Sequence, residues 1–150
     1  MTLTTKEQGL LKDMKGQETL CIKKYEEYAQ RAIATNLKNL FNRMADVERT
    51  HLTTVNDMMA GNVTPVSGPI KGNNQDCTAF AYTSEADRQH DAFLCQDMLA
   101  MEKHASGLYD TAVFEFADPV ARKVLNHIQS EEQQHGEQLY AYMKANQMYS

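Results

Sequence analysis

The strongest constraint in this sequence is a repeat of two long stretches related by a shift of 84 positions without gaps. The shift places identical residues on one another, including Asp13 on Asp97, Glu18 on Glu102, Tyr25 on Tyr109, Glu48 on Glu132 and His51 on His135. Among the other pairs of similar residues, most are apolar in both copies. An internal repeat of this length predicts that one structural unit occurs twice in the fold.

The first copy reads as two helices. Residues 5–60 contain no proline, and their apolar residues recur at intervals of three and four, which is the period of an α-helix. A short break near Ala34 divides the stretch, and Thr35 or Asn36 is the expected N-cap of the second helix. The first copy is therefore expected to form a helical hairpin.

The second copy, residues 84–145, has the same organisation, with Ser84 as the expected first cap. Asp118–Pro119 provides its break, because proline suits the first turn of a new helix and disfavours helix at the residue before it. Glycine, proline and the lack of a helical period mark a long connection between the copies. The sequence therefore predicts a single all-α domain over 1–150: a four-helix bundle of two antiparallel hairpins, 5–60 and 84–145, joined by a crossover at 61–83.

The repeat also carries chemistry. Each second helix holds a Glu-x-x-His pair, which puts a carboxylate and an imidazole on one face, one turn apart. Each first helix holds a glutamate about as far before the break as the pair lies after it (~24 Å against ~21 Å of helix). When the hairpins face each other, four glutamates and two histidines meet. The predicted metal ligands are Glu18, Glu48, His51, Glu102, Glu132 and His135.

The charges of this cluster favour a metal pair. Two carboxylates ~5 Å apart repel by ~3 kcal/mol at an effective dielectric constant of about 20, so four of them in a core need protons or cations. Two divalent cations neutralise four carboxylates, and the mixture of imidazole and carboxylate suits Fe or Mn, with Zn also compatible. Two alternatives stay open: the glutamates lie on solvated faces, or the site keeps its ligands and binds no metal.

Three further residues are candidates to support the ligands. Tyr25 and Tyr109 lie two helical turns after the first-helix glutamates, so each phenol is placed to hydrogen-bond a carboxylate across the bundle. The alternative is that both tyrosines only fill the core. Glu131 lies one turn before His135 and is expected to hold its second ring nitrogen, whereas the matching position in the first copy is Val47.

The remaining cysteines and histidines suggest no second site. Cys21, Cys77 and Cys95 form no CxxC motif and are expected to be free, buried thiols, with Cys21 and Cys95 in the core. The other three histidines are expected to lie on the surface: His90, His104 and His127.

Charge and hydropathy exclude several classes of protein. The net charge of −5 and the absence of a basic stripe give no support for nucleic-acid binding. No apolar run reaches the roughly 18–20 residues of a membrane span, and the polar start contains no signal-peptide segment, so an intracellular protein is expected.

The ligand pattern on four helices resembles the ferritin-like superfamily, in which the middle connection is long because the second and third helices are parallel. The second half is also similar to the Coat F family of spore coat proteins. The shared features are the start MLAMEK, Tyr109, the break at Asp118–Pro119, the run EEQQH and an ending of YM followed by a final tyrosine. This resemblance implies a small protein laid on the spore surface.

Two functions stay open at this point. The first is a structural coat protein in which metal stabilises the bundle. The second is a di-iron or di-manganese oxidoreductase that acts on peroxide, O2 or Fe(II). Expected partners are a second copy of the chain, since homodimers are common, or other coat proteins.

Overall fold

The computed structural model describes residues 1–66, 68, 70 and 72–149. It contains four long helices, and within these residues there is no strand, so the predicted all-α class with four helices is confirmed. The helices are α1 (Thr5–Arg31), α2 (Thr35–Met59), α3 (Glu85–Glu115) and α4 (Pro119–Ala145). None of the helices in the described part of the chain is long and apolar enough to span a membrane.

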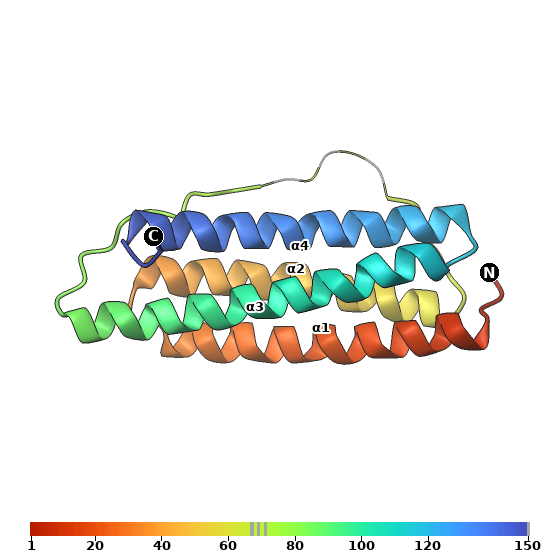
Figure 1. Cartoon of the computed structure of the whole chain (residues 1–150), viewed down its shortest axis with the longest axis horizontal. Helices are drawn as coiled ribbons and strands as arrows, with labels where there is room; N and C mark the ends of the chain where they lie inside the picture. Colours follow the sequence, from red (N-terminus) through yellow and green to blue (C-terminus); the bar gives the residue numbers. More distant parts are fainter. Residues whose placement is uncertain (67, 69, 71, 150) are drawn as a thin grey trace.

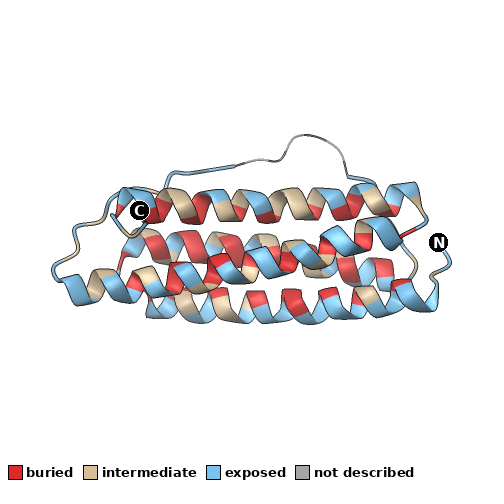
Figure 2. Ribbon diagram, in the orientation of Figure 1, coloured by how far each residue is buried: buried red, intermediate tan, exposed pale blue. Residues whose placement is uncertain are grey.

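The four helices lie side by side as a bundle (Figure 1). Helix α1 packs mainly against α2, and α3 against α4, while α1 also contacts α3 and α2 contacts α4. Neighbouring helices run in opposite directions, and α2 and α3 run in the same direction, so the end of α2 and the start of α3 lie at opposite ends of the bundle. Burial follows the helical period, with one stripe of each helix turned inward (Figure 2).

Local chemistry explains where most helices begin. Thr4 and Glu7 form a reciprocal capping box at the start of α1. The predicted cap Ser84 is confirmed, because its hydroxyl accepts a backbone N–H in the first turn of α3. The predicted break at Asp118–Pro119 is also confirmed, with Asp118 as the N-cap and Pro119 as the first residue of α4.

The prediction of Thr35 or Asn36 as the cap of α2 is wrong. The N-cap is Ala34, which has no side-chain hydrogen bond to offer. A carboxylate from the other hairpin accepts backbone N–H groups at the start of α2 instead. Asp91 in α3 is fully buried, and its two oxygens accept the backbone N–H groups of Ile33 at 2.9 Å and Ala34 at 3.0 Å. The turn between α1 and α2 therefore depends on α3.

The first hairpin makes the equivalent contact with the turn of the second hairpin. Glu7 in α1, 4 % exposed, accepts the backbone N–H of Ala117 at 3.2 Å, in the turn between α3 and α4. Glu7 matches Asp91 in the repeat, and Ile33 matches Ala117. Each hairpin thus places a carboxylate on the turn of the other hairpin, which fixes the relative height of the two copies.

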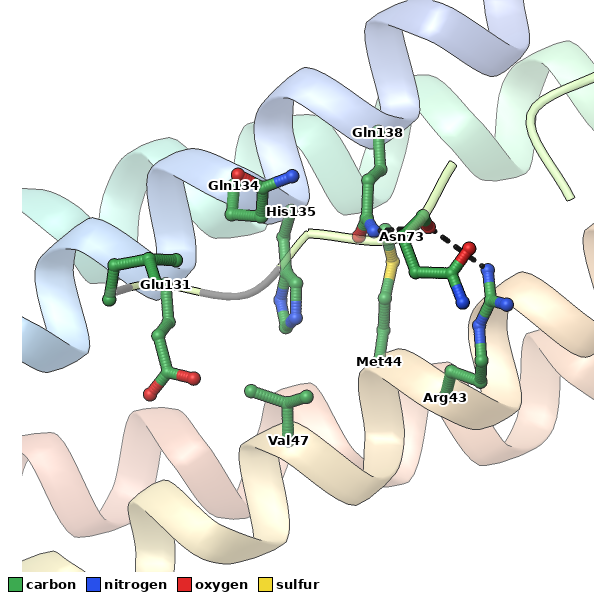
Figure 3. A pocket seen from close by; sticks show the side chains of 9 residues that line it. Arg43, Met44, Val47, Asn73, Glu131, Gln134, His135 and Gln138 are labelled. Atoms are coloured by element: carbon green, nitrogen blue, oxygen red, sulfur yellow. Dashed lines mark hydrogen bonds between the residues drawn. The ribbon is translucent and has the colours of Figure 1, made fainter. Parts of the chain in front are cut away.

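The described part of the connection after α2 packs against α2 and α4. The backbone oxygen of Asn73 accepts hydrogen bonds from Arg43 at 3.4 Å and Gln138 at 2.8 Å (Figure 3). The thiol of Cys77 donates to the backbone oxygen of Gln138 at 3.3 Å, and Asp76 pairs with Arg43 at 2.8 Å. These contacts hold the second part of the connection over the α2–α4 face.

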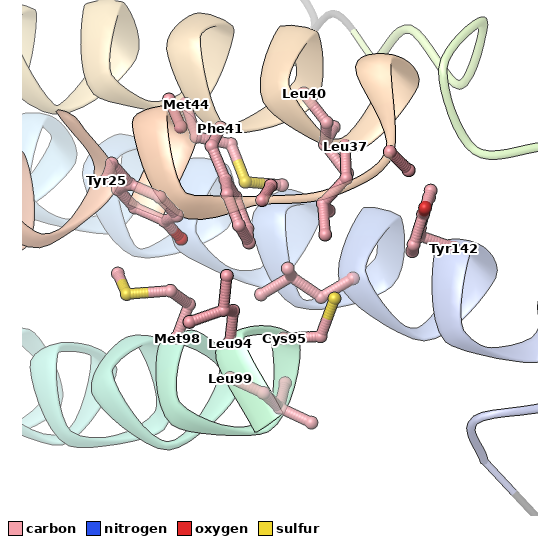
Figure 4. Packing of buried hydrophobic residues seen from close by; sticks show 14 of the residues in the cluster. Tyr25, Leu37, Leu40, Phe41, Met44, Leu94, Cys95, Met98, Leu99 and Tyr142 are labelled. Atoms are coloured by element: carbon pink, nitrogen blue, oxygen red, sulfur yellow. The ribbon is translucent and has the colours of Figure 1, made fainter. Parts of the chain in front are cut away.

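The apolar core is divided into two clusters. One contains Phe41, Met98 and Cys95 (Figure 4), and the other contains Leu11, Val55 and Ile128. All three cysteines are free; Cys21 and Cys95 are buried as predicted, whereas Cys77 is only partly buried, because it lies in the connection on the bundle surface. Buried polar side chains occupy the space between the clusters.

We expect Asp91→Ala to lower the free energy of unfolding by about 2–4 kcal/mol, because it leaves the buried backbone N–H of Ala34 and the partly buried N–H of Ile33 without an acceptor. Urea unfolding followed by circular dichroism measures the loss. Asp110→Ala, an exposed position on the same helix, is the control and should change stability by less than about 0.5 kcal/mol. A loss in Asp91→Ala no larger than the control's would contradict the cross-hairpin capping.

Candidate metal centre

The structure brings the six predicted ligand residues together between the two apolar clusters. Each second helix presents its glutamate and histidine on one face, and each first helix adds a glutamate at the same height. None of the six is more than 3 % exposed: Glu18, Glu48, His51, Glu102, Glu132 and His135. Charged side chains are almost never this buried without partners, so their convergence identifies a candidate site.

The ligand atoms fall into two groups whose members lie within 4.8 Å of one another. One group contains Glu18, Glu48, His51 and Glu132, and the other contains Glu48, Glu102 and His135. Glu48 belongs to both groups and lies between them. Each group combines carboxylates with one imidazole, so these buried residues could hold metal ions.

Both histidines turn the same ring nitrogen toward the carboxylates. Nδ1 of His51 lies 3.1 Å from Oε2 of Glu48 and 3.7 Å from Oε2 of Glu18. Nδ1 of His135 lies 3.0 Å from Oε1 of Glu48 and 3.0 Å from Oε1 of Glu102. Glu48 therefore contacts both imidazoles, one with each oxygen, and Nδ1 is the nitrogen placed to bind a cation.

The two tyrosines link the hairpins at this level. The hydroxyl of Tyr25 donates to Oε1 of Glu102 at 2.6 Å, and that of Tyr109 donates to Oε1 of Glu18 at 2.8 Å. Both rings are fully buried and pack in the apolar clusters. Each tyrosine thus fills the core and also orients a carboxylate of the opposite hairpin, as its place in the repeat led us to expect.

Four oxygens of the cluster have no hydrogen-bond partner among the described residues: Oε2 of Glu18, Oε2 of Glu102 and both oxygens of Glu132. Each buried polar atom without a partner costs about 1–3 kcal/mol, and such atoms in a folded protein call for an explanation. Glu132 is 1 % exposed. A pair of divalent cations between the two groups would give these oxygens partners, so the residues fit a metal pair.

Burial and mutual repulsion set the protonation of the cluster. Burial raises the pKa of Glu132 and of Glu48, and the charges of the neighbouring glutamates raise both further. Burial opposes the charging of His51 and His135, but the carboxylates around them raise the pKa of both. The folded protein therefore keeps protons in the cluster near neutral pH, and cations would displace them.

The structure contradicts the predicted role of Glu131. Its Oε1 lies 3.1 Å from Nε2 of His51 on α2, and not against His135 on its own helix. His135 is drawn toward Glu48 and Glu102 inside the bundle, whereas the partly exposed Glu131 leans across the α2–α4 interface. Sequence spacing indicates neighbours along one helix and does not show that a side chain prefers the facing helix.

The prediction of three surface histidines is correct for His90 and His104, which are exposed. It is wrong for His127, which is partly buried and whose Nε2 lies 3.2 Å from Glu131. His127 therefore reaches the outer edge of the site through Glu131. Its spacing of four residues before Glu131 contained that signal.

In the part of the chain that the structure describes, two openings reach the cluster from outside. A cavity of about 130 Å³ between α2 and α4 is lined by residues that include Val47, Glu131 and His135 (Figure 3). A groove of about 460 Å³ between α3 and α4 reaches Glu102 and Glu132.

The groove arises where the two copies differ. Ser106 and Gly136 line it, and the matching residues of the first hairpin are the larger Ile22 and Leu52. A Cβ atom on Gly136 would lie no closer than 3.8 Å to its nearest neighbour, so there is room at this position.

One comparison with known proteins bears on this site. The family model of the Coat F domain matches residues 90–150. The match contains Glu102, Tyr109, Glu132 and His135. It supports the similarity to the spore coat family that the sequence indicated for the second half, and the first hairpin lies outside the matched residues. No curated protein and no solved structure matches the chain.

The raised pKa of Glu132 gives a prediction for the metal-free protein. A carboxyl group whose pKa is higher in the folded than in the unfolded state lowers stability as the pH rises above the unfolded value of about 4.5. Glu132→Gln keeps the shape and cannot ionise. We expect it to stabilise the metal-free protein by about 1–3 kcal/mol at pH 7, with no gain at pH 4.

Urea unfolding in the presence of a chelator, at pH 7 and pH 4, measures this effect. Glu137→Gln, an exposed position on the same helix, is the control and should have little effect at either pH. An equal loss of stability in Glu132→Gln at both values would show that the carboxyl is not strained in the folded protein.

Proposed function

We propose that this protein is a ferritin-like member of the spore coat that holds two divalent metal ions in its bundle. The observation that carries the proposal is the convergence of four buried glutamates and two histidines, in which four carboxylate oxygens have no hydrogen-bond partner in the described part of the chain. The proposed ligands are those that the repeat predicts: Glu18, Glu48, His51, Glu102, Glu132 and His135.

Charge supports a pair of ions. Four carboxylates carry four negative charges, and two divalent cations balance them with neutral imidazoles as further ligands. Fe and Mn suit this mixture of ligands, and Zn is also compatible. A single divalent ion would leave two of the carboxylates to be neutralised by protons, whereas two ions balance all four.

A structural role for the metal is supported by the distribution of the proposed ligands over the helices. All four helices contribute, so bound metal would connect the two hairpins at their centre. An ion that binds the folded state and not the unfolded state stabilises the protein by mass action. A bundle of this kind on a spore surface would gain resistance to unfolding from its metal.

We expect protein purified without chelator to contain about two Fe or Mn ions per chain by elemental analysis. At free metal about a hundredfold above Kd, each ion adds about 2.7 kcal/mol. The melting temperature should therefore rise by at least about 10 °C over the metal-free protein.

The double variant His51→Ala, His135→Ala should lose both the metal and the rise in melting temperature. His104→Ala removes an exposed histidine of α3 and should keep both. If the wild-type protein holds no metal even after anaerobic loading with Fe(II) or Mn(II), the bundle does not bind metal and the proposal fails.

A second candidate is an oxidoreductase acting on peroxide, O2 or Fe(II), and the two openings favour it. They connect His135 on one side, and Glu102 and Glu132 on the other, with the surface. Bound Fe or Mn would supply the change of oxidation state. The chain's own part would be to hold the carboxylates with Tyr25 and Tyr109 and to admit small molecules while apolar residues surround the site.

Disappearance of peroxide tests this candidate. Metal-loaded protein should consume peroxide faster than the variant Glu48→Ala, Glu132→Ala at the same total metal concentration. Equal rates would leave the structural role as the better account, because free metal ions would then explain all of the turnover.

A further inference from the structure

The two groups of candidate ligands differ in the residue that contacts Nε2 of their histidine. Both imidazoles face the carboxylates with Nδ1, so Nε2 of each ring points away from the cluster. Nε2 of His51 meets Oε1 of Glu131 at 3.1 Å. For His135, no hydrogen bond at Nε2 is found among the described residues.

The repeat shows where this difference comes from. Residue 131 matches residue 47, and His51 matches His135, so the position equivalent to Glu131 beside His135 is Val47. Val47 and His135 line the same cavity between α2 and α4 (Figure 3). A methyl-bearing side chain and open space therefore replace the carboxylate that backs the other histidine.

The surrounding charges act in the same direction. Glu131 adds a negative charge next to the first group of ligands, and that group has four members. The second group has three members. Glu131 also lines the cavity beside His135, but its Oε1 contacts His51 and His127 and not His135. A cation is thus favoured at the first position by more ligands and by an additional carboxylate.

A carboxylate behind a ligating histidine fixes its ring orientation and raises its basicity, and losing such a partner costs about 10–100-fold in metal affinity. We propose that the two positions are inequivalent. The position of Glu18, Glu48, His51 and Glu132 binds the first ion, backed by Glu131, and the position of Glu48, Glu102 and His135 binds the second ion more weakly. This inference rests on the proposed function.

Titration of metal-free protein with Mn(II) in an anaerobic calorimeter tests the proposal. The wild-type protein should bind two ions in two stages that differ by about 10–100-fold in affinity. His135→Ala should keep the tighter stage alone, and His51→Ala should keep the weaker stage alone. Two stages of equal affinity, or a tight stage that survives in His51→Ala, would overturn the assignment.

Glu131→Gln isolates the backing carboxylate, and its partial exposure makes it tolerant of substitution. It should weaken the tighter stage by about 10–100-fold and leave the weaker stage unchanged. Glu137→Gln removes the same charge from an exposed site on the same helix and should change neither stage. Equal effects of the two variants would contradict a specific role for Glu131.

The titration separates the proposed function from the inequivalence of the two positions. Wild-type protein that binds no Mn(II) at all would contradict the proposed function, and this inference with it. Wild-type protein that binds two ions with a single affinity would contradict this inference alone.

Discussion

The repulsion among four buried glutamates is the constraint on which the rest of this structure depends. Their convergence places several carboxylates within 4.8 Å of one another in a space that apolar clusters enclose on both sides. Without compensation, such a cluster works against folding, because each unpaired buried carboxyl group costs free energy. The tyrosine hydroxyls and the imidazoles compensate for part of this cost, and protons or cations must compensate for the rest.

The internal repeat organises that compensation. Tyr25 and Tyr109 cross from one hairpin to a carboxylate of the other, and Glu7 and Asp91 cross to the opposite turn. These reciprocal contacts lock the two copies in register, so that the ligand residues meet at one height. The copies differ at two places that matter here. Glu131 and Val47 make the surroundings of the two histidines unequal, and Gly136, which matches Leu52, lines the groove between α3 and α4.

Much of the site followed from the sequence because helical spacing decides which side chains share a face and at what height. The six ligand candidates and the two tyrosine contacts needed only that spacing and the shift between the copies. The partner of Glu131 could not be derived in this way, because it depends on how far α4 lies from α2. The cap of α2 was missed because a single helix sequence does not show that Asp91 approaches from another hairpin.

The repeat did contain a signal for that cap. Glu7 and Asp91 are both acidic and occupy matching positions, and a comparison of all matched acidic residues would have marked them. Which neighbouring helix a side chain such as Asp91 or Glu131 contacts depends on the tertiary packing, and the sequence of one helix does not show it.

Anomalous diffraction from crystals of Mn-loaded protein, recorded near the metal absorption edge, would locate the proposed ions in the bundle. We expect two anomalous peaks inside the bundle, one next to Nδ1 of His51 and one next to Nδ1 of His135, with Glu48 between them. Peaks only at acidic residues on the surface, or none, would contradict this expectation and show that the buried carboxylates are neutralised by protons alone.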